Sequence, residues 1–446
     1  MTALSFQTLS VNFPAGYRNI FIGYSGGIDS HVLLHLCASE PDIRKVMTAV
    51  YIHHGLQVAA DEWGRHCETQ CQRLDVDFKM LKVDAAPKTG ESPESAALNA
   101  RYQALRSLLG PHDLLLVAQH REDQMETLLL QLFRGSGIQG LAAMPVVMKF
   151  GQGFLVRPLL EVSKQAIQNY AEQHALQWIE DPSNRDNAFD RNFLRNQVVP
   201  LLKQRWPSLD KTVSRAARHC ASSVRFTDEW LEQAFPQIFA ADDNSLFIEK
   251  WLQFSENNRA ILLRHWLTVL GLKPPGEAFL QAVISEVINS KETANAQVFT
   301  QGYYIKRYRQ KLYCLAESCF IPETKVREWP SHESEFELLN GYKLQRTVAE
   351  SGINKNLWHK NTITIKSRCG GEKLKLPGRD GHHCLKNLYQ EAGVPPWERE
   401  IRPLIYLDGH FAAVAGLWVA EWAWQQDTGE CYQVMWRQPG KNLTYI

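Results

Sequence analysis

Residues 21–30 read FIGYSGGIDS, and the rest of the chain is organised around them. An apolar run with strand character ends at Tyr24, and the residues from Asp29 to Ala38 have the pattern of a helix start. Adjacent glycines at 26 and 27 allow backbone N–H groups to converge on an anion, and a helix N-terminus adds a favourable potential for phosphate. No Gly-Lys-Ser/Thr follows, so this is not the Walker pattern. The stretch predicts a phosphate-binding loop between a strand and a helix.

Three polar side chains belong to this loop. Ser25 and Ser30 can add hydroxyl donors to a phosphate. Asp29 places a carboxylate there, and two anions repel each other unless a divalent cation lies between them. We therefore predict that Asp29 helps to hold Mg²⁺, with a plain glycine turn as the structural alternative.

Strand and helix patterns alternate from residue 18 to about 135, and the pattern is less regular after Gly140. Continuous apolar strands separated by helices predict a doubly wound α/β domain with a parallel sheet. In such sheets ligands bind beyond the carboxyl ends of the strands. The expected strands are 46–52, 78–83 and 114–118, and the expected helices are 59–74, 94–109 and 121–133. Segments 23–27, 53–56 and 119–123 each follow a strand, so we expect them to meet at one rim of the sheet.

The segment 120–127 carries a second group of polar residues, which a helix would place on one face by three- and four-residue spacing. This face holds His120, Asp123, Glu126 and Thr127. An acid pair there could coordinate Mg²⁺ or hold an ammonium group. The alternative is a solvated helix start, where acids are favoured by the helix dipole.

Basic residues mark two further places. Arg101 could contact phosphates through its planar guanidinium, or pair with a helix acid. The segment 191–225 has eight Lys or Arg residues against one acid, Asp210. This excess suits contacts with an RNA backbone, although a solvated basic face is the alternative.

The whole chain sets broader limits. Its 446 residues are more than a single hydrophobic core usually contains, so two or three domains are expected. A net charge of +1 means that any nucleic-acid site must be a local patch. The nine cysteines form no C-x-x-C pair, which argues against disulfides and zinc or iron–sulfur sites. Without a signal peptide or a long apolar stretch, we expect a cytoplasmic protein with no membrane partner.

Several motifs occur in an order that resembles the tRNA(Ile)-lysidine synthetase family, long form, within the PP-loop ATP pyrophosphatase superfamily. The resemblance reaches both ends of the chain, and only residues from about 225 to 335 lack a motif. The matching segments are 25–30, 53–56, 94–102, 120–127, 134–137, 181–195, 368–375 and 393–399.

The resemblance implies an ATP-dependent ligase that uses ATP and Mg²⁺. Members adenylate the C2 oxygen of the wobble cytidine, position 34, of an isoleucine tRNA with a CAU anticodon. L-lysine then displaces AMP to form lysidine, which changes codon reading from AUG to AUA. Pyrophosphate is the other product. The sequence leaves open whether the chain forms a homodimer.

The resemblance also assigns residues. The ATP site would comprise Ser25, Gly26, Gly27, Ile28, Asp29, Ser30, His53 and Arg101. Catalysis would rest on Asp29, His120, Asp123 and Glu126, with Asp29 as the metal ligand, and which acid receives lysine stays open. Contacts with tRNA would come from Arg191, Arg195, Arg205, Arg215, Arg218, Lys373, Lys375 and Arg399.

We expect four parts: a catalytic PP-loop domain over 1–208, a mainly helical tRNA-binding domain over 209–320, a linker over 321–339 and a small β-rich tRNA-binding domain over 340–446. Two other interpretations compete with the ligase. A PP-loop tRNA thiolation enzyme normally needs cysteines to carry sulfur, and no C-x-x-C pair exists here. A non-catalytic RNA-binding scaffold would not need the intact 25–30 and 120–127 motifs.

Overall fold

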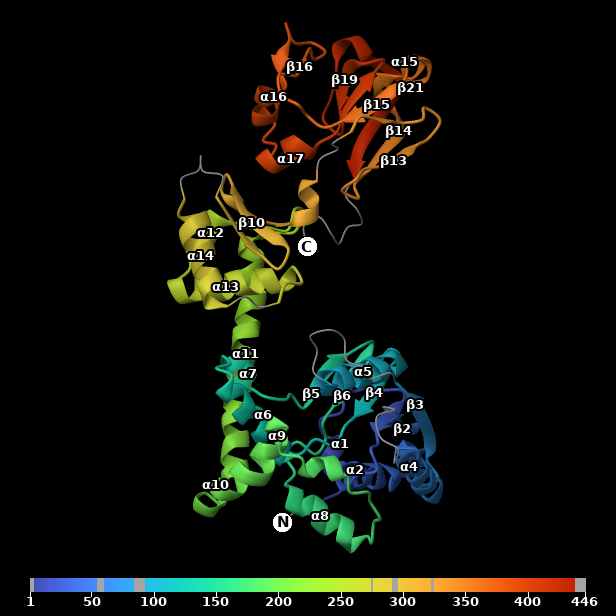
Figure 1. Cartoon of the computed structure of the whole chain (residues 1–446), viewed down its shortest axis with the longest axis vertical. Helices are drawn as coiled ribbons and strands as arrows, with labels where there is room; N and C mark the ends of the chain where they lie inside the picture. Colours follow the sequence, from blue (N-terminus) through green and yellow to red (C-terminus); the bar gives the residue numbers. More distant parts are fainter. Residues whose placement is uncertain are drawn as a thin grey trace. The chain divides into compact units, whose positions relative to one another are not determined.

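A computed structural model gives the structure of residues 4–53, 60–83, 93–273, 276–290, 296–321 and 325–437. Contacts within the chain divide it into two compact units, Met1–Asp228 and Glu229–Ile446. The N-terminal unit is built around one sheet (Figure 1). No helix in the described part of the chain is long and apolar enough to cross a membrane.

The N-terminal sheet has six strands in the order β3-β2-β1-β4-β6-β5. All neighbouring strands are parallel except β5, which runs antiparallel to β6. This confirms the expected doubly wound α/β fold. The strands are β1 Ile20–Gly23, β2 Met47–His53, β3 Asp77–Lys82, β4 Leu114–Leu116, β5 Val147–Phe150 and β6 Gly153–Val156.

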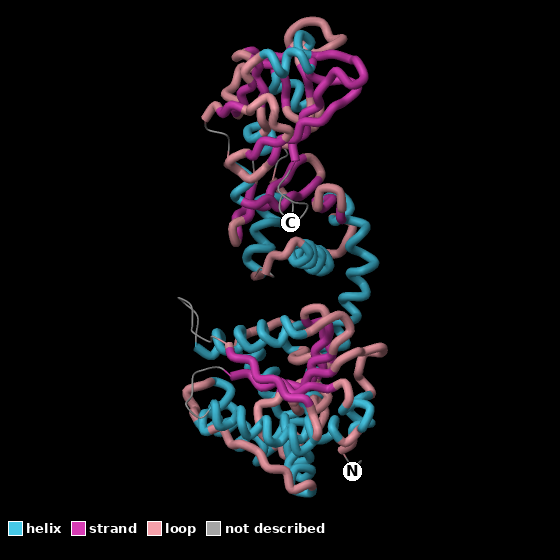
Figure 2. The backbone as a smooth tube through the Cα atoms, turned by 90° about the vertical axis from the view of Figure 1, so that its right-hand side faces the viewer, coloured by secondary structure: helices cyan, strands magenta, loops and turns pink. Residues whose placement is uncertain are grey.

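Helices cover both faces of this sheet (Figure 2). Side chains of Ile20 and Ile22 on β1 belong to one core, together with residues of α2 Ile28–Ala38, α4 Ala60–Leu74 and α8 Lys164–Gln173. A second core lies on the opposite face. It includes Leu105 of α5 Pro93–Leu108 and Leu109, which directly follows that helix. Because alternate residues of a strand face opposite sides, β1 is buried between the two layers.

A third, smaller core holds the helices that follow the sheet. Met125 of α6 Arg121–Phe133 packs with Leu194 and Val199. The other helices here are α9 Asp190–Phe193, the π-helical η2 Leu194–Val198, α10 Val199–Arg205 and α11 Leu209–Ile238. This core places the segment around residues 191–195 against α6.

The C-terminal unit begins with a region that mixes helices and strands. Trp251 and Trp266 are fully buried in its core. A mainly helical region was expected here, and a five-stranded sheet of order β7-β8-β11-β10-β9 accompanies its helices. The elements are β7 Phe239–Ala240, β8 Ser245–Phe247, α12 Ile248–Trp251, α13 Glu256–Val269, α14 Glu277–Ala282, η3 Val283–Ile288, β9 Gln297–Thr300, β10 Tyr303–Tyr308 and β11 Lys311–Ala316.

The last region is β-rich, as expected. Its sheets have the orders β12-β15-β18-β19-β20, β13-β14-β21 and β16-β17. The elements are η4 Glu317–Phe320, β12 Arg327–Glu328, β13 Glu335–Glu337, β14 Lys343–Asn354, α15 Lys355–Lys360, β15 Ile363–Lys366, β16 Lys373–Leu374, β17 His383–Cys384, α16 Leu385–Glu391, α17 Pro396–Ile401, β18 Leu404–Leu407, β19 His410–Val414, β20 Trp418–Val419 and β21 Trp424–Arg437.

The segment expected to be a linker, 321–339, contributes two of these strands. β12 pairs with β15, and β13 pairs with β14. Trp329 and Phe336 are buried in the same core as residues of the later strands. Burial of two aromatic side chains offsets the conformational entropy lost on ordering the segment, although its composition is acidic and contains proline.

Candidate active site

The loop after β1 needs glycine at position 26. Gly26 has a φ of +81°, and a Cβ there would lie 2.8 Å from Ile179 Cδ1 and 3.0 Å from Cys67 Sγ. The Ile179 N–H donates to the Gly26 carbonyl over 2.9 Å. A side chain at this position would strain the backbone and push against both neighbours.

Two serines close the same loop. Ser30 Oγ donates to the Gly27 carbonyl at 2.9 Å, the Ser25 N–H donates to Ser30 Oγ at 3.2 Å, and the two hydroxyl oxygens are 3.1 Å apart. Gly27 is the N-cap of α2. Because glycine has no side chain, no capping group accepts from the first backbone N–H groups of the helix. The loop therefore combines a helix N-terminus with two hydroxyl groups, as a phosphate site requires.

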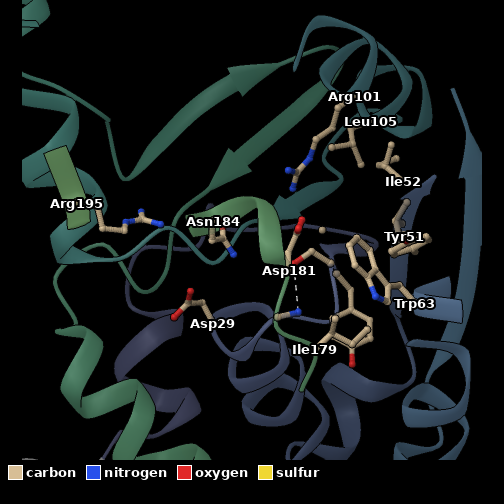
Figure 3. A pocket seen from close by; sticks show the side chains of 15 residues that line it. Asp29, Tyr51, Ile52, Trp63, Arg101, Leu105, Ile179, Asp181, Asn184 and Arg195 are labelled. Atoms are coloured by element: carbon tan, nitrogen blue, oxygen red, sulfur yellow. Dashed lines mark hydrogen bonds between the residues drawn. The ribbon is translucent and has the colours of Figure 1, made fainter. Parts of the chain in front are cut away.

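A cavity of about 400 Å³ lies at the carboxyl ends of β1 and β2. Figure 3 shows Trp63, Tyr51, Ile52 and Leu105 at one end and Asp29, Asn184 and Arg195 at the other, with Arg101 and Asp181 between them. One end is thus suited to a flat, apolar ring system, and the other to charged groups. The remaining lining residues are Gly23, Tyr24, Ser25, Gly27, Val50 and Ile179.

Two residues predicted to bind the nucleotide differ in their placement. A Cβ on Gly23 would lie 3.9 Å from Arg101 Nη2, so the Arg101 guanidinium lies over the end of β1. His53 is 8 % exposed at the end of β2, with its Nε2 3.2 Å from Asp61 Oδ1. Its neighbour Ile52 contributes to the cavity wall instead. Residues 54–56 of the expected motif, and the side chains of 94–98, lie outside the described residues.

His120 caps the helix that carries the acid pair. Its Nδ1 accepts from the Glu122 N–H at 3.2 Å, and Asp123 Oδ2 accepts from the His120 N–H at 3.0 Å. This reciprocal capping fixes the first turn of α6. His120 Nε2 then faces two carboxylates, 3.4 Å from Asp123 Oδ2 and 3.8 Å from Asp29 Oδ1.

The acid pair has an arginine as its counter-ion. Arg195 Nε donates to Glu126 Oε1 at 2.7 Å, and Arg195 Nη2 donates to Glu126 Oε2 at 2.8 Å and to Asp123 Oδ1 at 2.7 Å. Glu126 is 2 % exposed. Arg191 Nη2 donates to Thr127 Oγ1 at 2.9 Å, and its Nε is 3.8 Å from Glu126 Oε2. Both arginines, expected to contact tRNA, point into the site.

Asp29 has an unusual environment for a carboxylate. Its Oδ1 is buried and has no hydrogen-bond partner among the described residues. Burial raises the pKa of Asp29 above its usual range and Asp123 adds to this, although His120, Lys164 and Arg195 lower it. An unsatisfied buried carboxylate oxygen fits a metal ligand. Within the described part of the chain, no three His, Cys, Asp or Glu side chains form a metal cluster.

None of the other residues predicted to bind tRNA lines the cavity. Lys375 Nζ pairs with Glu421 at 2.6 Å, and Arg399 Nε donates to the Val394 carbonyl at 2.7 Å. These two cations are already engaged inside the C-terminal unit. The solvent-exposed residues of this set are Arg205, Arg215, Arg218 and Lys373.

Some cavity residues were missed by sequence reasoning. Asp181 and Asn184 belong to a segment that the family resemblance had marked, but without a role. Trp63 and Leu105 gave no signal, because an apolar residue on an amphipathic helix is normally a core residue. Only the fold brings α4 and α5 to the same end of the sheet.

Comparison with known proteins identifies the family of this chain. A family model described as a PP-loop domain matches residues 2–202, one described as the TilS substrate binding domain matches 246–313, and one described as the TilS substrate C-terminal domain matches 363–436. The tRNA(Ile)-lysidine synthase of Methylococcus capsulatus is 38 % identical over 403 residues, which are 90 % of this chain and 92 % of that protein. The chain belongs to the tRNA(Ile)-lysidine synthase family.

A second relative extends the match over nearly the whole chain. The tRNA(Ile)-lysidine synthase of Pectobacterium atrosepticum is 38 % identical over 436 residues, 97 % of each protein. Membership of this family favours the ligase interpretation over tRNA thiolation. The solved U34-tRNA thiolase NcsA from Methanococcus maripaludis aligns with 48 % of this chain and 77 % of its own at 15 % identity and a TM-score of 0.40, which is too weak a likeness to carry an argument.

Proposed function

We propose that this chain works in the cytoplasm, where it joins L-lysine to C2 of the wobble cytidine of an isoleucine tRNA with a CAU anticodon. ATP activates the cytidine, and AMP and pyrophosphate are released. The observation that carries this proposal is Arg195, which lines the cavity at its charged end and also bonds Asp123 and Glu126. One guanidinium thus links the expected nucleotide site to the expected amine site.

The cavity has room and chemistry for ATP. The adenine ring would lie at the end formed by Trp63, Ile52 and Leu105, where stacking on an aromatic side chain contributes on the order of 1–3 kcal/mol. The phosphates would lie on the glycine loop, beneath Arg101. Asp29 would hold Mg²⁺ through its unsatisfied Oδ1, and when bound the cation would neutralise phosphate charge.

The first reaction step makes a leaving group. The C2 oxygen of cytidine attacks the α-phosphorus of ATP, the bond to the bridging oxygen breaks, and pyrophosphate leaves. In the second step this oxygen can therefore leave C2 as part of AMP, which is a much better leaving group than the unactivated oxygen. Arg101, Arg195 and the N-terminus of α2 supply positive potential for the charge that develops on the phosphate oxygens.

The second step needs a neutral amine. Lysine arrives as an ammonium ion, and Asp123 or Glu126 can accept its proton and orient the nitrogen. The amine attacks C2, the C2–oxygen bond breaks, and AMP leaves with the electron pair. Guanidinium groups bind phosphate in a bidentate manner, so a phosphate can draw Arg195 away from the acids. The lysine ammonium would then take the place of the Arg195 guanidinium beside Asp123 and Glu126.

The tRNA would reach the site along exposed cations. Arg205, Arg215 and Arg218 are exposed on α10 and α11, and Arg215 and Arg218 are three residues apart on the same helix. This spacing suits two phosphates of one RNA backbone. Lys373 offers a further exposed cation in the C-terminal unit, whereas Lys375 and Arg399 would need to give up internal partners.

The test uses the purified chain with the isoleucine tRNA, ATP and labelled lysine. We expect lysine to be incorporated into the tRNA in equal amount to the AMP released, and only when the wobble base is cytidine. Without lysine, adenylated tRNA should accumulate. AMP release that does not depend on tRNA, together with no labelled tRNA, would reject the proposed function.

A further inference from the structure

Arg157 is a buried cation that the proposed chemistry does not use. It follows β6 directly and is 6 % exposed. No carboxylate of the described residues lies within ion-pairing distance of it. A guanidinium buried without a counter-ion is unfavourable unless its N–H groups are satisfied by other acceptors.

Two neutral acceptors bond Arg157, and a phenol is its third neighbour. Its Nε donates to Gln119 Oε1 at 2.5 Å, and its Nη1 donates to the Pro145 carbonyl at 2.8 Å. The Tyr102 hydroxyl lies beside the same guanidinium. These partners come from three separate segments: the end of β4, the turn before β5, and α5. A planar group with five N–H donors can reach all three, whereas a lysine ammonium has a single nitrogen.

Two of these partners adjoin residues of the site. Tyr102 directly follows Arg101, which lines the cavity. Gln119 directly precedes His120, the cap of the helix that carries the acid pair. Consecutive Cα atoms are about 3.8 Å apart, so fixing one residue of each pair restricts its neighbour.

The third partner leads to the same helix. Gln124 of α6 donates to the Met144 carbonyl at 2.9 Å and accepts from the Met144 N–H at 2.9 Å. Met144 directly precedes Pro145, whose carbonyl accepts from Arg157. Arg157 therefore reaches α6 by two routes, through Gln119 and through Pro145.

We propose that Arg157 is a positioning residue that sets Arg101 and the acid-bearing end of α6 at a fixed separation. This inference rests on the proposed function, in which Arg101 contacts ATP and the acids of α6 receive lysine. Arg101 and the acids of α6 must keep their separation because the same cytidine takes part first in adenylation and then in the attack by lysine. Displacement of a reacting group by about 1 Å can reduce the rate on the order of 100-fold.

The first measurement is hydrogen exchange of the free protein, which does not depend on the reaction. Arg157→Met removes all three contacts and keeps an unbranched side chain. We expect faster exchange of backbone amides at the start of α6 and around Arg101, with the amides of β1 and β2 unchanged. Equal acceleration throughout the sheet, or none at all, would overturn the positioning role.

Kinetics give the second measurement. Arg157→Met should lower kcat for lysine incorporation about 100-fold and raise the KM for ATP, and Arg157→Lys should restore only part of this. Tyr102→Phe removes one hydroxyl and should raise the KM for ATP with little change in kcat. The matched control is Arg106→Met on α5, an exposed arginine 5.1 Å from the Phe150 ring, which should behave as wild type.

These outcomes separate two failures. A wild-type protein that ligates no lysine would reject the proposed function, and the exchange data would still test Arg157. A wild-type protein that ligates lysine, with full kcat and KM in Arg157→Met, would reject the inference alone. If Arg157→Met does not fold, Tyr102→Phe provides the test, and an unchanged KM for ATP in that variant would overturn the inference.

Discussion

Replacing Glu126 by glutamine should separate the amine step from adenylation. Glu126 is almost fully buried, and both of its oxygens accept hydrogen bonds from Arg195. Glutamine has the same shape but no charge. One of its two polar ends is an NH₂ group, which would face an N–H of Arg195 instead of accepting from it.

The expected loss can be estimated from these contacts. Removing one partner of a buried ion pair costs about 3–5 kcal/mol. Arg195 is 29 % exposed and keeps its bond to Asp123, so a loss of about 2 kcal/mol is more appropriate. If a lysine ammonium occupies the place of Arg195, this corresponds to a rise in the lysine KM of about 30-fold. Adenylation of tRNA should change little, because Glu126 itself does not line the cavity.

The assay measures the two steps apart. Adenylated tRNA is trapped with labelled ATP in the absence of lysine, and lysidine formation is then followed against lysine concentration. The control is Glu161→Gln, an exposed acid just before α8, which should change neither quantity. If Glu126→Gln forms no adenylated tRNA, the acid pair serves the phosphates and their metal, and the assignment to lysine is wrong.

Three further outcomes are expected. Gly26→Ala should reduce stability by about 1–2 kcal/mol and weaken ATP binding, because its φ is +81°; thermal unfolding and calorimetric titration with ATP measure both. Burial alone would raise the pKa of Glu122, but the adjacent His120 ring and a hydrogen bond from the Lys164 N–H lower it to about 2. The wild-type protein should therefore have a larger free energy of unfolding than Glu122→Gln above pH ~4.5, and this difference should vanish as the pH falls towards 2. Urea unfolding of both proteins at several pH values measures it. Changing Arg215 and Arg218 together to Gln should reduce the salt slope of tRNA binding by up to ~2 units, with ATP affinity unchanged.

The sequence by itself was sufficient for strands β1 to β4 of the N-terminal sheet and for the family. The helix predicted over 121–133 is α6 with the same ends, and the predicted strand 46–52 differs from β2 by one residue at each end. Continuous apolar runs and glycine loops are local signals, so they survive in a single sequence. The strands β5 and β6 were not predicted, because Pro145 and Pro158 flank them and glycines at 151 and 153 interrupt the apolar pattern.

Tertiary structure alone determined how the site residues pair. Arg195 was expected to contact tRNA, because a basic segment gives no indication of which acids it will meet. The fold brings it against Glu126, which is 69 residues earlier in the chain, through the small core of Met125, Leu194 and Val199. Local patterns carry helix and strand propensity, but long-range packing decides which charges are buried together, and burial is what makes such a pair strong enough to matter for chemistry.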